Sequence, residues 1–443
     1  MPKMSSAQPG RNVKKGNGDL RAYPCPATPH EERTLQDLGQ HGQTFMPLLR
    51  QVPGFHIYRD TGIDSMHCIY LGVFKTLFKI LFKDNAGKGK PFFLGADGLQ
   101  LANEIMENVR STSFLTRGIR LPTDSIHWKA HEWREWGLLY SVYVLHTMVD
   151  MGRFPRRYYE HWLLLSVGVG ILNSSSITPV QLKEAERLLH LWSRDFTELY
   201  TDKNCLFNLH LVVHLPSTVA RLGPLWCTSL FQFENYNTIL LNSMNGPRYI
   251  LEQITSRLGW RHSIERLRTE VSKQSQQHVV PLVDKMMNRR SPISKPVCKG
   301  SYQMIHLTEE QSDLINSVGD YDVTVRSYER VSYRNLTFST YSYSHKNYKQ
   351  DLCYFYSNVY GYGRIDKIVI APRSPDCLVF FNPVNGSNLL SNGAVCPYIL
   401  SQATVNSQLK VMNAECLNKQ TITMHNMDYT MFLMYKPNDV EGS

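Results

Sequence analysis

The chain has 443 residues, of which 42% are hydrophobic, so it has the composition of a globular protein with a large core and two or three domains. Nine cysteines without a CxxC pair exclude a disulfide scaffold, and the absence of a long apolar run excludes a membrane span. The net charge is +10, and +8 of it lies in residues 1–320, which favours a polyanionic partner such as DNA. The polar N-terminus lacks a secretory apolar segment, so we expect a nuclear or cytoplasmic protein without membrane contact.

The N-terminal half of the chain is predicted to be helical. Residues 1–36 are rich in Gly, Pro, Ser and Lys, which predicts a flexible segment, and helical periodicity then runs through residues 37–290. From Met66 to Leu81 apolar residues recur at every third or fourth position, so they form one helix stripe. Asp64 stands just before this helix, where its carboxylate would cap free N–H groups. Further helices are predicted over about 128–143, 181–200, 207–221, 234–244 and 248–277.

In the C-terminal part of the chain, aromatic residues alternate with other residues instead of following the spacing of a helix. Pro292 and Pro296 and a polar stretch predict a linker over 291–320. Ten tyrosines lie between Tyr321 and Tyr362 in alternating runs, which indicates strands, and Asn385-Gly386 is expected to form a turn. We therefore predict an α+β protein, with a mainly helical body over 37–290 and a separately packed β-rich domain over 321–443.

Polar residues within the helical region are the candidates for chemistry. Asp64 and His67 share the stretch DSMH, and Glu234 follows an aromatic run. His210 and His214 are four residues apart, so on a helix both imidazoles lie on the same side, as in a zinc-binding pair.

Each candidate also has a purely structural interpretation. Asp64 is then a helix cap and His67 a hydrogen-bonded core residue. Zinc requires three or four ligands, so the histidine pair is either a packing feature or needs help from a flanking cysteine, Cys205 or Cys227. The cluster of Trp128, Trp133 and Trp136 is most simply core, and the sequence contains no P-loop, GxSxG or HExxH motif.

Four segments in this order resemble the CACTA (En/Spm-type) transposases of DNA transposons. DSMHCIYLGVFKTL is similar to the family's Asp-x-Met-His motif, and HWKAHEWREWGLLY to its Trp-Lys-Ala-x-Glu-x-Arg segment. NLHLVVHLPSTVARLGPLWCTSLFQFENYN resembles the family's block with a histidine pair, Gly-Pro-Leu-Trp and Phe-Glu-x-x-Asn. The match covers roughly residues 20 to 270, and YGYGRIDKIV resembles a strand pair of the family's C-terminal β-domain.

The resemblance implies a DDE recombinase, in which three carboxylates hold two Mg²⁺ or Mn²⁺ ions for phosphoryl transfer on DNA. Glu234 matches the final carboxylate, carried on a helix that closes over an RNase H-like sheet. His210 and His214 match a pair that completes a Zn²⁺ site with an upstream CxxC. Asp64 and His67 match a motif whose implied role is local architecture.

The chain departs from the family pattern upstream of the match. The family's first two catalytic aspartates and its CxxC lie before the point at which this chain begins to match, so one third of the triad and half of the zinc site are present. We therefore expect a truncated or degenerate transposase-derived protein, inactive as a nuclease by itself, that binds DNA or another transposase subunit, including a second copy of itself. Two alternatives are an active subunit that receives the aspartates from a missing exon or a partner, and a host interaction protein that kept only the fold.

Overall fold

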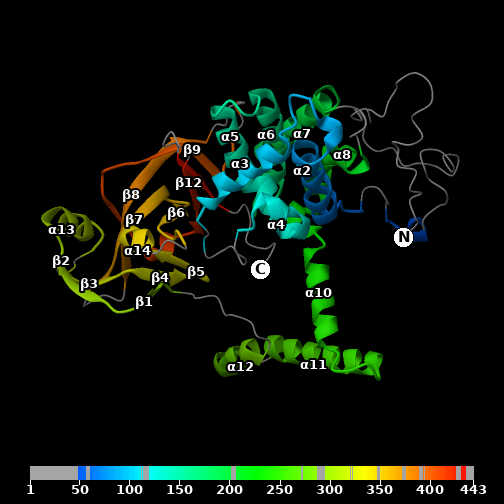
Figure 1. Ribbon diagram of the computed structural model, residues 1–443. Coiled ribbons are helices and arrows are strands. Elements are labelled where there is room, and N and C mark those ends of the chain that lie inside the picture. Colours follow the sequence, from blue (N-terminus) through cyan, green and yellow to red (C-terminus); the bar gives the residue numbers. More distant parts are fainter. Residues whose placement is uncertain are drawn as a thin grey trace, which may run out of the picture.

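The computed structural model describes residues 48–55, 60–110, 112, 119–200, 206–270, 273–286, 295–319, 321, 323–346, 350–371, 376–388, 393, 395–425 and 431–435. The segment 1–36, predicted to be flexible, lies outside these residues. The described residues confirm an α+β protein, with helices first and antiparallel strands after them (Figure 1). None of the described helices is long and apolar enough to cross a bilayer.

The helical part contains no strand in its described residues between 48 and 286. Its larger helices are α2 (Lys75–Phe82), α3 (Gly95–Glu107), α4 (Ala130–Glu135), α5 (Ser141–Asp150), α6 (Arg156–Leu172), α7 (Pro179–Tyr200), α8 (Phe207–Leu211), α9 (Leu215–Leu222), α10 (Phe231–Asn242), α11 (Ile250–Glu270) and α12 (Lys273–Met286). Two π-helical segments are η3 (Met66–Phe74) and η6 (Trp136–Tyr140), and short 3₁₀ turns are η2 (Leu48–Gln51), η4 (Asn85–Gly87), η5 (Pro122–His127), η8 (Val212–His214) and η9 (Leu225–Cys227).

The apolar stripes predicted from the sequence become the core of this body. The helix predicted from Met66 to Leu81 is η3 continued by α2, and the one predicted near 128–143 is α4, η6 and α5 in succession. The two π-helical segments pack together because Gly137 has no side chain: a Cβ there would stand 2.1 Å from the Phe74 ring. Trp128, Trp133 and Trp136 are buried around Phe78, which confirms their interpretation as core residues.

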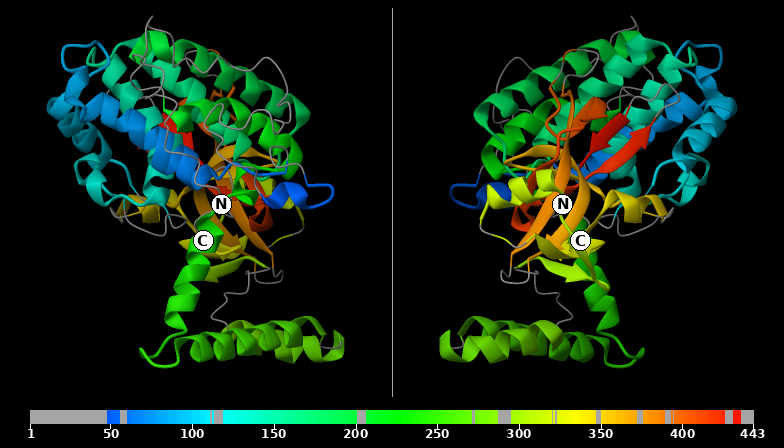
Figure 2. Two further views of the ribbon diagram at one scale, coloured as in Figure 1. Left: turned by 90° about the vertical axis from the view of Figure 1, so that its right-hand side faces the viewer. Right: turned by 90° about the vertical axis from the view of Figure 1, so that its left-hand side faces the viewer.

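Helices α10, α11 and α12 leave this body. Figures 1 and 2 show α10 as a stalk that projects from the body, with α11 and α12 forming a crossbar at its far end. No residue of α10 is buried. Gln253 fixes the elbow between stalk and crossbar, since its side-chain amide donates to the carbonyls of Gly246 and Arg248 and accepts from the N–H of Asn245. The stalk and the crossbar are therefore held at a defined angle but are not packed into the core.

The β-rich part consists of two antiparallel sheets. One has the order β1-β4-β5, and the other follows β11-β6-β7-β8-β9-β13-β12, with β10 on β8 and β3 on β7; β2 pairs with β3 at the edge. The elements are β1 (Val297–Lys299), β2 (Gln303–His306), α13 (Glu309–Asn316), β3 (Thr324–Tyr328), β4 (Arg330–Tyr333), β5 (Leu336–Ser339), α14 (Tyr341–Lys346), β6 (Tyr354–Ser357), β7 (Gly361–Ile370), β8 (Cys377–Ser387), β9 (Ile399–Val405), β10 (Lys410–Asn413), η10 (Ala414–Cys416), β11 (Lys419–Gln420), β12 (Ile422–His425) and β13 (Met431–Met434).

Two local predictions in this region are wrong. The described part of the expected linker, 295–319, forms β1, β2 and α13, because edge strands of three or four residues give too short an alternation to recognise beside prolines. Asn385-Gly386 does not form a turn but lies inside β8, at a shift in register against β9. Gly386 is needed there because a Cβ would stand 2.6 Å from the carbonyl oxygen of Ser401.

The two parts also share a core, which differs from the separate packing expected from their periods. Side chains from the strand region belong to the same buried cluster as the helices: Cys396, Tyr398, Ile399, Ile422, Met424 and Met434. Tyr398 donates its hydroxyl to the carbonyl of Ser166 in α6 at 3.1 Å. The ring lies against Gly170 one turn further on, where a Cβ would stand 1.9 Å from the hydroxyl oxygen.

Replacing Gly170 with alanine tests this shared core. The added methyl group collides with the buried Tyr398, so we expect Gly170→Ala to lower the free energy of unfolding by about 1–3 kcal/mol. Gly246→Ala is the control, because nothing lies within 4 Å of a Cβ at that position. Urea titration of both variants measures the difference, and equal midpoints would contradict the contact between helices and strands.

Candidate functional site

The carboxylate of Asp64 joins two segments that are far apart in the sequence. Its Oδ1 accepts hydrogen bonds from the backbone N–H groups of Met66 at 3.0 Å and Leu230 at 2.9 Å. Its Oδ2 accepts from the backbone N–H of His67 at 3.1 Å and from the ring Nδ1 of His67 at 2.5 Å. One side chain thus caps the start of η3, as predicted, and also the residue before α10.

His67 and Glu234 face each other beside this cap. Because a carboxylate only accepts hydrogen bonds, the Nδ1 that faces Asp64 carries a proton, and in the neutral tautomer of the ring Nε2 is the nitrogen with the lone pair. Nε2 lies 3.7 Å from Oε1 of Glu234. The side chain of His67 is 53% exposed and that of Glu234 is 58% exposed, so both reach solvent.

Other contacts fasten the same segments together. The hydroxyl of Thr228 donates to the carbonyl of Ile63 at 3.0 Å, and a Cβ on Gly62 would stand 2.6 Å from the Thr228 methyl group. Tyr70 of η3 packs on Phe231 of α10 with ring centroids 5.9 Å apart. These contacts place the first turn of α10, and with it Glu234, against the start of η3.

The Trp-Lys-Ala-x-Glu-x-Arg segment reaches the same place through Arg134. This arginine is buried, and its guanidinium lies over the ring of Phe231 at 5.6 Å, within range of a cation–π contact. Glu132 is also buried, and its carboxylate holds the start of its own helix. It accepts a hydrogen bond from the N–H of Lys129 at 2.5 Å and pairs with Nε of Arg120 at 3.3 Å. The segment therefore supplies support for α10 rather than a free carboxylate.

The hydrogen bonds at this site decide which side-chain atoms can still bind a metal ion or accept a proton. Four N–H donors use the roughly four acceptor positions of the Asp64 carboxylate, so it has none left for a metal ion. The groups that could still bind a metal ion here are Nε2 of His67 and the carboxylate of Glu234. They offer one nitrogen ligand and one oxygen ligand from two residues. Among the described residues no group of three His, Cys, Asp or Glu side chains is placed to hold a metal ion. His67, held in one tautomer by a carboxylate, has the arrangement of a general base.

Within the part of the chain that the structure describes, the histidine pair does not combine with Glu234 into a group of three possible metal ligands. His210 in α8 and His214 in η8 face the same side, as predicted, with their Nε2 atoms 3.2 Å apart and the rings edge to face. Of the two cysteines considered as helpers, Cys227 is exposed and Cys205 lies outside the described residues. Two imidazoles at this separation fit either a hydrogen bond between neutral rings or two ligands of one zinc ion.

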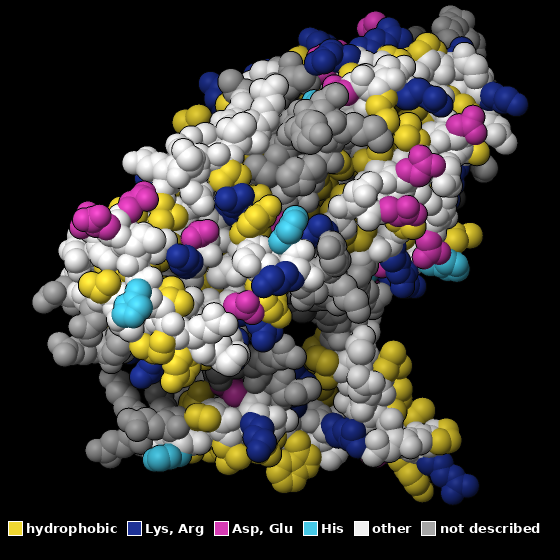
Figure 3. Space-filling model, turned by 60° about the vertical axis from the view of Figure 1, so that its left-hand side comes forward, with side chains coloured by type: hydrophobic (Ala, Val, Ile, Leu, Met, Phe, Trp, Pro, Cys, Tyr) yellow, Lys and Arg dark blue, Asp and Glu magenta, His cyan; other side chains and the backbone are white. Residues whose placement is uncertain are grey.

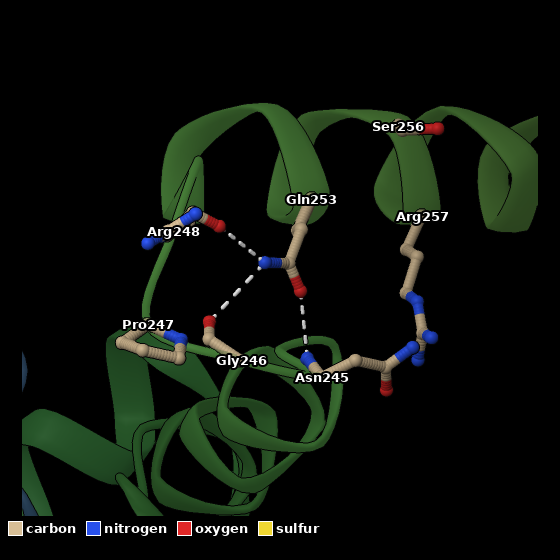
Figure 4. A pocket seen from close by; sticks show the side chains of 7 residues that line it. All are labelled: Asn245, Gly246, Pro247, Arg248, Gln253, Ser256 and Arg257. Carbon is tan, nitrogen blue, oxygen red and sulfur yellow. Dashed lines mark hydrogen bonds between the residues drawn. The ribbon is translucent and has the colours of Figure 1, made fainter.

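A pocket of about 540 Å³ lies at the elbow, the opposite end of α10 from Glu234. Figure 4 shows it between α11 and the loop that precedes this helix, with Gln253 and Arg257 pointing into it. Gln253 is engaged with the loop as described above, and Arg257 donates to the carbonyl of Asn242 at 3.2 Å. These polar groups hold the elbow in shape, so the pocket is an element of the stalk's architecture rather than a second chemical site.

Sequence reasoning missed the partners that assemble the site. The N–H of Leu230 and the buried Arg134 had no role in the predictions, although both lie inside the quoted motifs. The ring that the Arg134 guanidinium covers belongs to Phe231, in a separate motif, so no local pattern pairs these two residues. No local signal identifies Leu230, since any residue can donate its backbone N–H.

Comparisons with protein-family models, curated proteins and solved structures found no match to this chain. The motifs quoted above and their convergence in space are accordingly what bears on function.

Removing the Asp64 carboxylate separates its structural role from that of Glu234. Asp64→Ala leaves three backbone N–H groups without their acceptor, so we expect it to lower the free energy of unfolding by about 1–3 kcal/mol. Glu234→Gln, an exposed change, should stay within about 0.5 kcal/mol of wild type. Chemical denaturation measures both, and a neutral Asp64→Ala would refute the double cap.

Zinc binding tests the histidine pair. With two ligands in place, we expect no stoichiometric zinc to survive dialysis against a mild chelator. The metal content of wild type, His210→Ala and Cys227→Ser shows whether the pair holds no stable zinc or shares a zinc ion with Cys227. One zinc ion per chain that is lost in both variants would show that the exposed cysteine completes the site.

Proposed function

We propose that this chain is a transposase-derived DNA-binding protein that does not cut DNA by itself. The observation that supports this proposal most is the state of the acids at the convergence of the motifs. Asp64 is engaged by four N–H donors, and Glu234, beside His67, is the one carboxylate of the quoted motifs that is more than half exposed there. Two-metal phosphoryl transfer needs several convergent carboxylates to hold the ions.

DNA binding is the part of the proposal that rests on charge. Residues 1–320 carry +8, and polyanion binding by such a region depends on counterion release rather than on base contacts. On the face of the protein in Figure 3, acidic and basic side chains are interspersed over the body. We therefore expect binding with little sequence preference and with affinity that falls as salt rises.

The exposure of His67 and Glu234 favours one alternative. Both side chains are more than half exposed, so ligands from another polypeptide can approach them. In that case this chain would supply Glu234 to a composite site whose remaining carboxylates come from a partner subunit.

Two assays on the full chain test the proposal. A mobility-shift titration of a DNA duplex should show binding at about 50 mM salt that weakens strongly by about 200 mM. No binding at the lower salt would refute the DNA-binding function.

The second assay measures strand cleavage of supercoiled plasmid with Mg²⁺ or Mn²⁺. We expect no nicking above background by wild type or by Glu234→Gln. Metal-dependent nicking by wild type that disappears in Glu234→Gln would contradict the proposal that the chain does not cut DNA by itself. It would show instead that Glu234 belongs to an active nuclease site.

A further inference from the structure

Helix α11 is exposed to solvent along its length. None of its described side chains is buried, and Figures 1 and 2 show the crossbar standing away from the body. Large apolar side chains on it reach solvent: Leu251 is 76%, Trp260 67% and Leu267 52% exposed. Figure 3 shows hydrophobic side chains along the stalk and crossbar with basic ones between them. Exposed apolar surface of this extent on a helix is typical of an interaction surface.

One face of α11 consists of small and charged residues. At helical spacing it carries Glu252, Thr255, Ser256, Gly259, His262, Ser263 and Arg266, all of them exposed. Gly259 is at its centre, and nothing lies within 4 Å of the position of a Cβ there. Half-buried residues such as Ile254 and Leu258 lie on a different face. Short side chains around a glycine allow another helix to approach to about 8 Å.

The order of residues on this face is self-complementary about Gly259. Glu252 and Arg266 lie seven residues before and after the glycine, and Thr255 and Ser263 lie four residues before and after it. When two copies of the helix run antiparallel around Gly259, each Glu252 faces Arg266 of the other copy. A parallel pair would instead place like charges together, which is unfavourable.

Apolar residues flank one edge of the same face. Trp260 is next to the centre, so in the antiparallel pair it lies beside Trp260 of the second copy. Leu267 is on the same edge and lies within two residues, about 3 Å along the axis, of the level of Tyr249 of the second copy, a residue that is 75% exposed in the single chain. A helix of 21 residues, about 32 Å long, thus offers two ion pairs around an aromatic and aliphatic strip.

We propose that α11 docks antiparallel on α11 of a second copy of this chain, with a two-fold axis at Gly259. A polyanion is a poorer occupant for this face, because the face presents Glu252 and, beyond Arg266, Glu270 to it. The inference stands on the crossbar alone and does not require the DNA-binding function.

A charge swap on the full chain tests the pairing. Sedimentation equilibrium of wild type should give twice the mass of the 51.1 kDa chain. Glu252→Arg and Arg266→Glu each place like charges across the axis and should weaken dimerisation at least about tenfold. The double variant restores opposite charges and should dimerise as wild type does. This rescue is specific, because the ion pair of Arg266 with Glu270 in its own helix, at 2.7 Å, is lost in the double variant as well.

Two further variants control for folding and geometry. Gly259→Leu favours the helix but blocks close approach, so it should be a folded monomer by circular dichroism and mass. Glu186→Arg, an exposed change on α7, should leave the dimer intact.

A wild-type monomer at concentrations on the order of 100 µM would overturn the proposal. A double variant that stays monomeric would refute the antiparallel register. DNA affinity is measured separately on the same variants. Single changes that alter DNA binding and leave the mass unchanged would identify the crossbar as a nucleic-acid surface and refute the pairing through α11.

Discussion

The Asp64 carboxylate is the constraint on which the arrangement of the helical body around Glu234 depends. A single acid accepts N–H groups from Met66, His67 and Leu230, and the last of these lies 166 residues away along the chain. Without this carboxylate, the first N–H groups of η3 and the N–H before α10 would lose the acceptor that holds the two helix starts together. The position of α10, and of everything that projects from the body beyond it, follows from this junction.

The same constraint limits the chemistry. A carboxylate that holds two helix starts and the imidazole of His67 has no lone pair to offer to a cation. The role that the family resemblance implies for Asp64, local architecture, agrees with these contacts. What is left at the surface is a histidine held in one tautomer and, 3.7 Å from its Nε2, the exposed carboxylate of Glu234.

The protein divides its apolar residues unequally between a dense core and an open arm. Strands from the C-terminal region complete the core of the helical body through Tyr398 and its neighbours, so the tail stabilises the helices it packs on. In contrast, α10 has no buried residue and α11 exposes Leu251 and Trp260. An arm of this kind is stable as a rigid extension when the elbow is fixed by Gln253 and when the exposed face is covered by a partner.

The sequence by itself determined the local features of this protein. The apolar stripe after Asp64 and the helix over about 181–200, observed as α7, were predicted because side-chain spacing along a helix is set by its 3.6-residue turn. The buried tryptophans, the common orientation of His210 and His214 and the α+β order of elements follow from the same local patterns. Short edge strands within 295–319 were missed because three or four residues carry too little alternation, and the Asn385-Gly386 pair because a glycine in a bulge resembles one in a turn.

Only the tertiary structure decided which distant groups meet. The Leu230 N–H, the Arg134 guanidinium on Phe231 and Tyr398 against Gly170 join residues from segments that no local pattern connects. These contacts are made by a backbone N–H, the face of an aromatic ring and a glycine that leaves room for a ring. Such groups have no sequence signature of their own. Whether Glu234 stood beside His67 was therefore decided by the packing of α10 on η3, and the same packing left the crossbar outside the core.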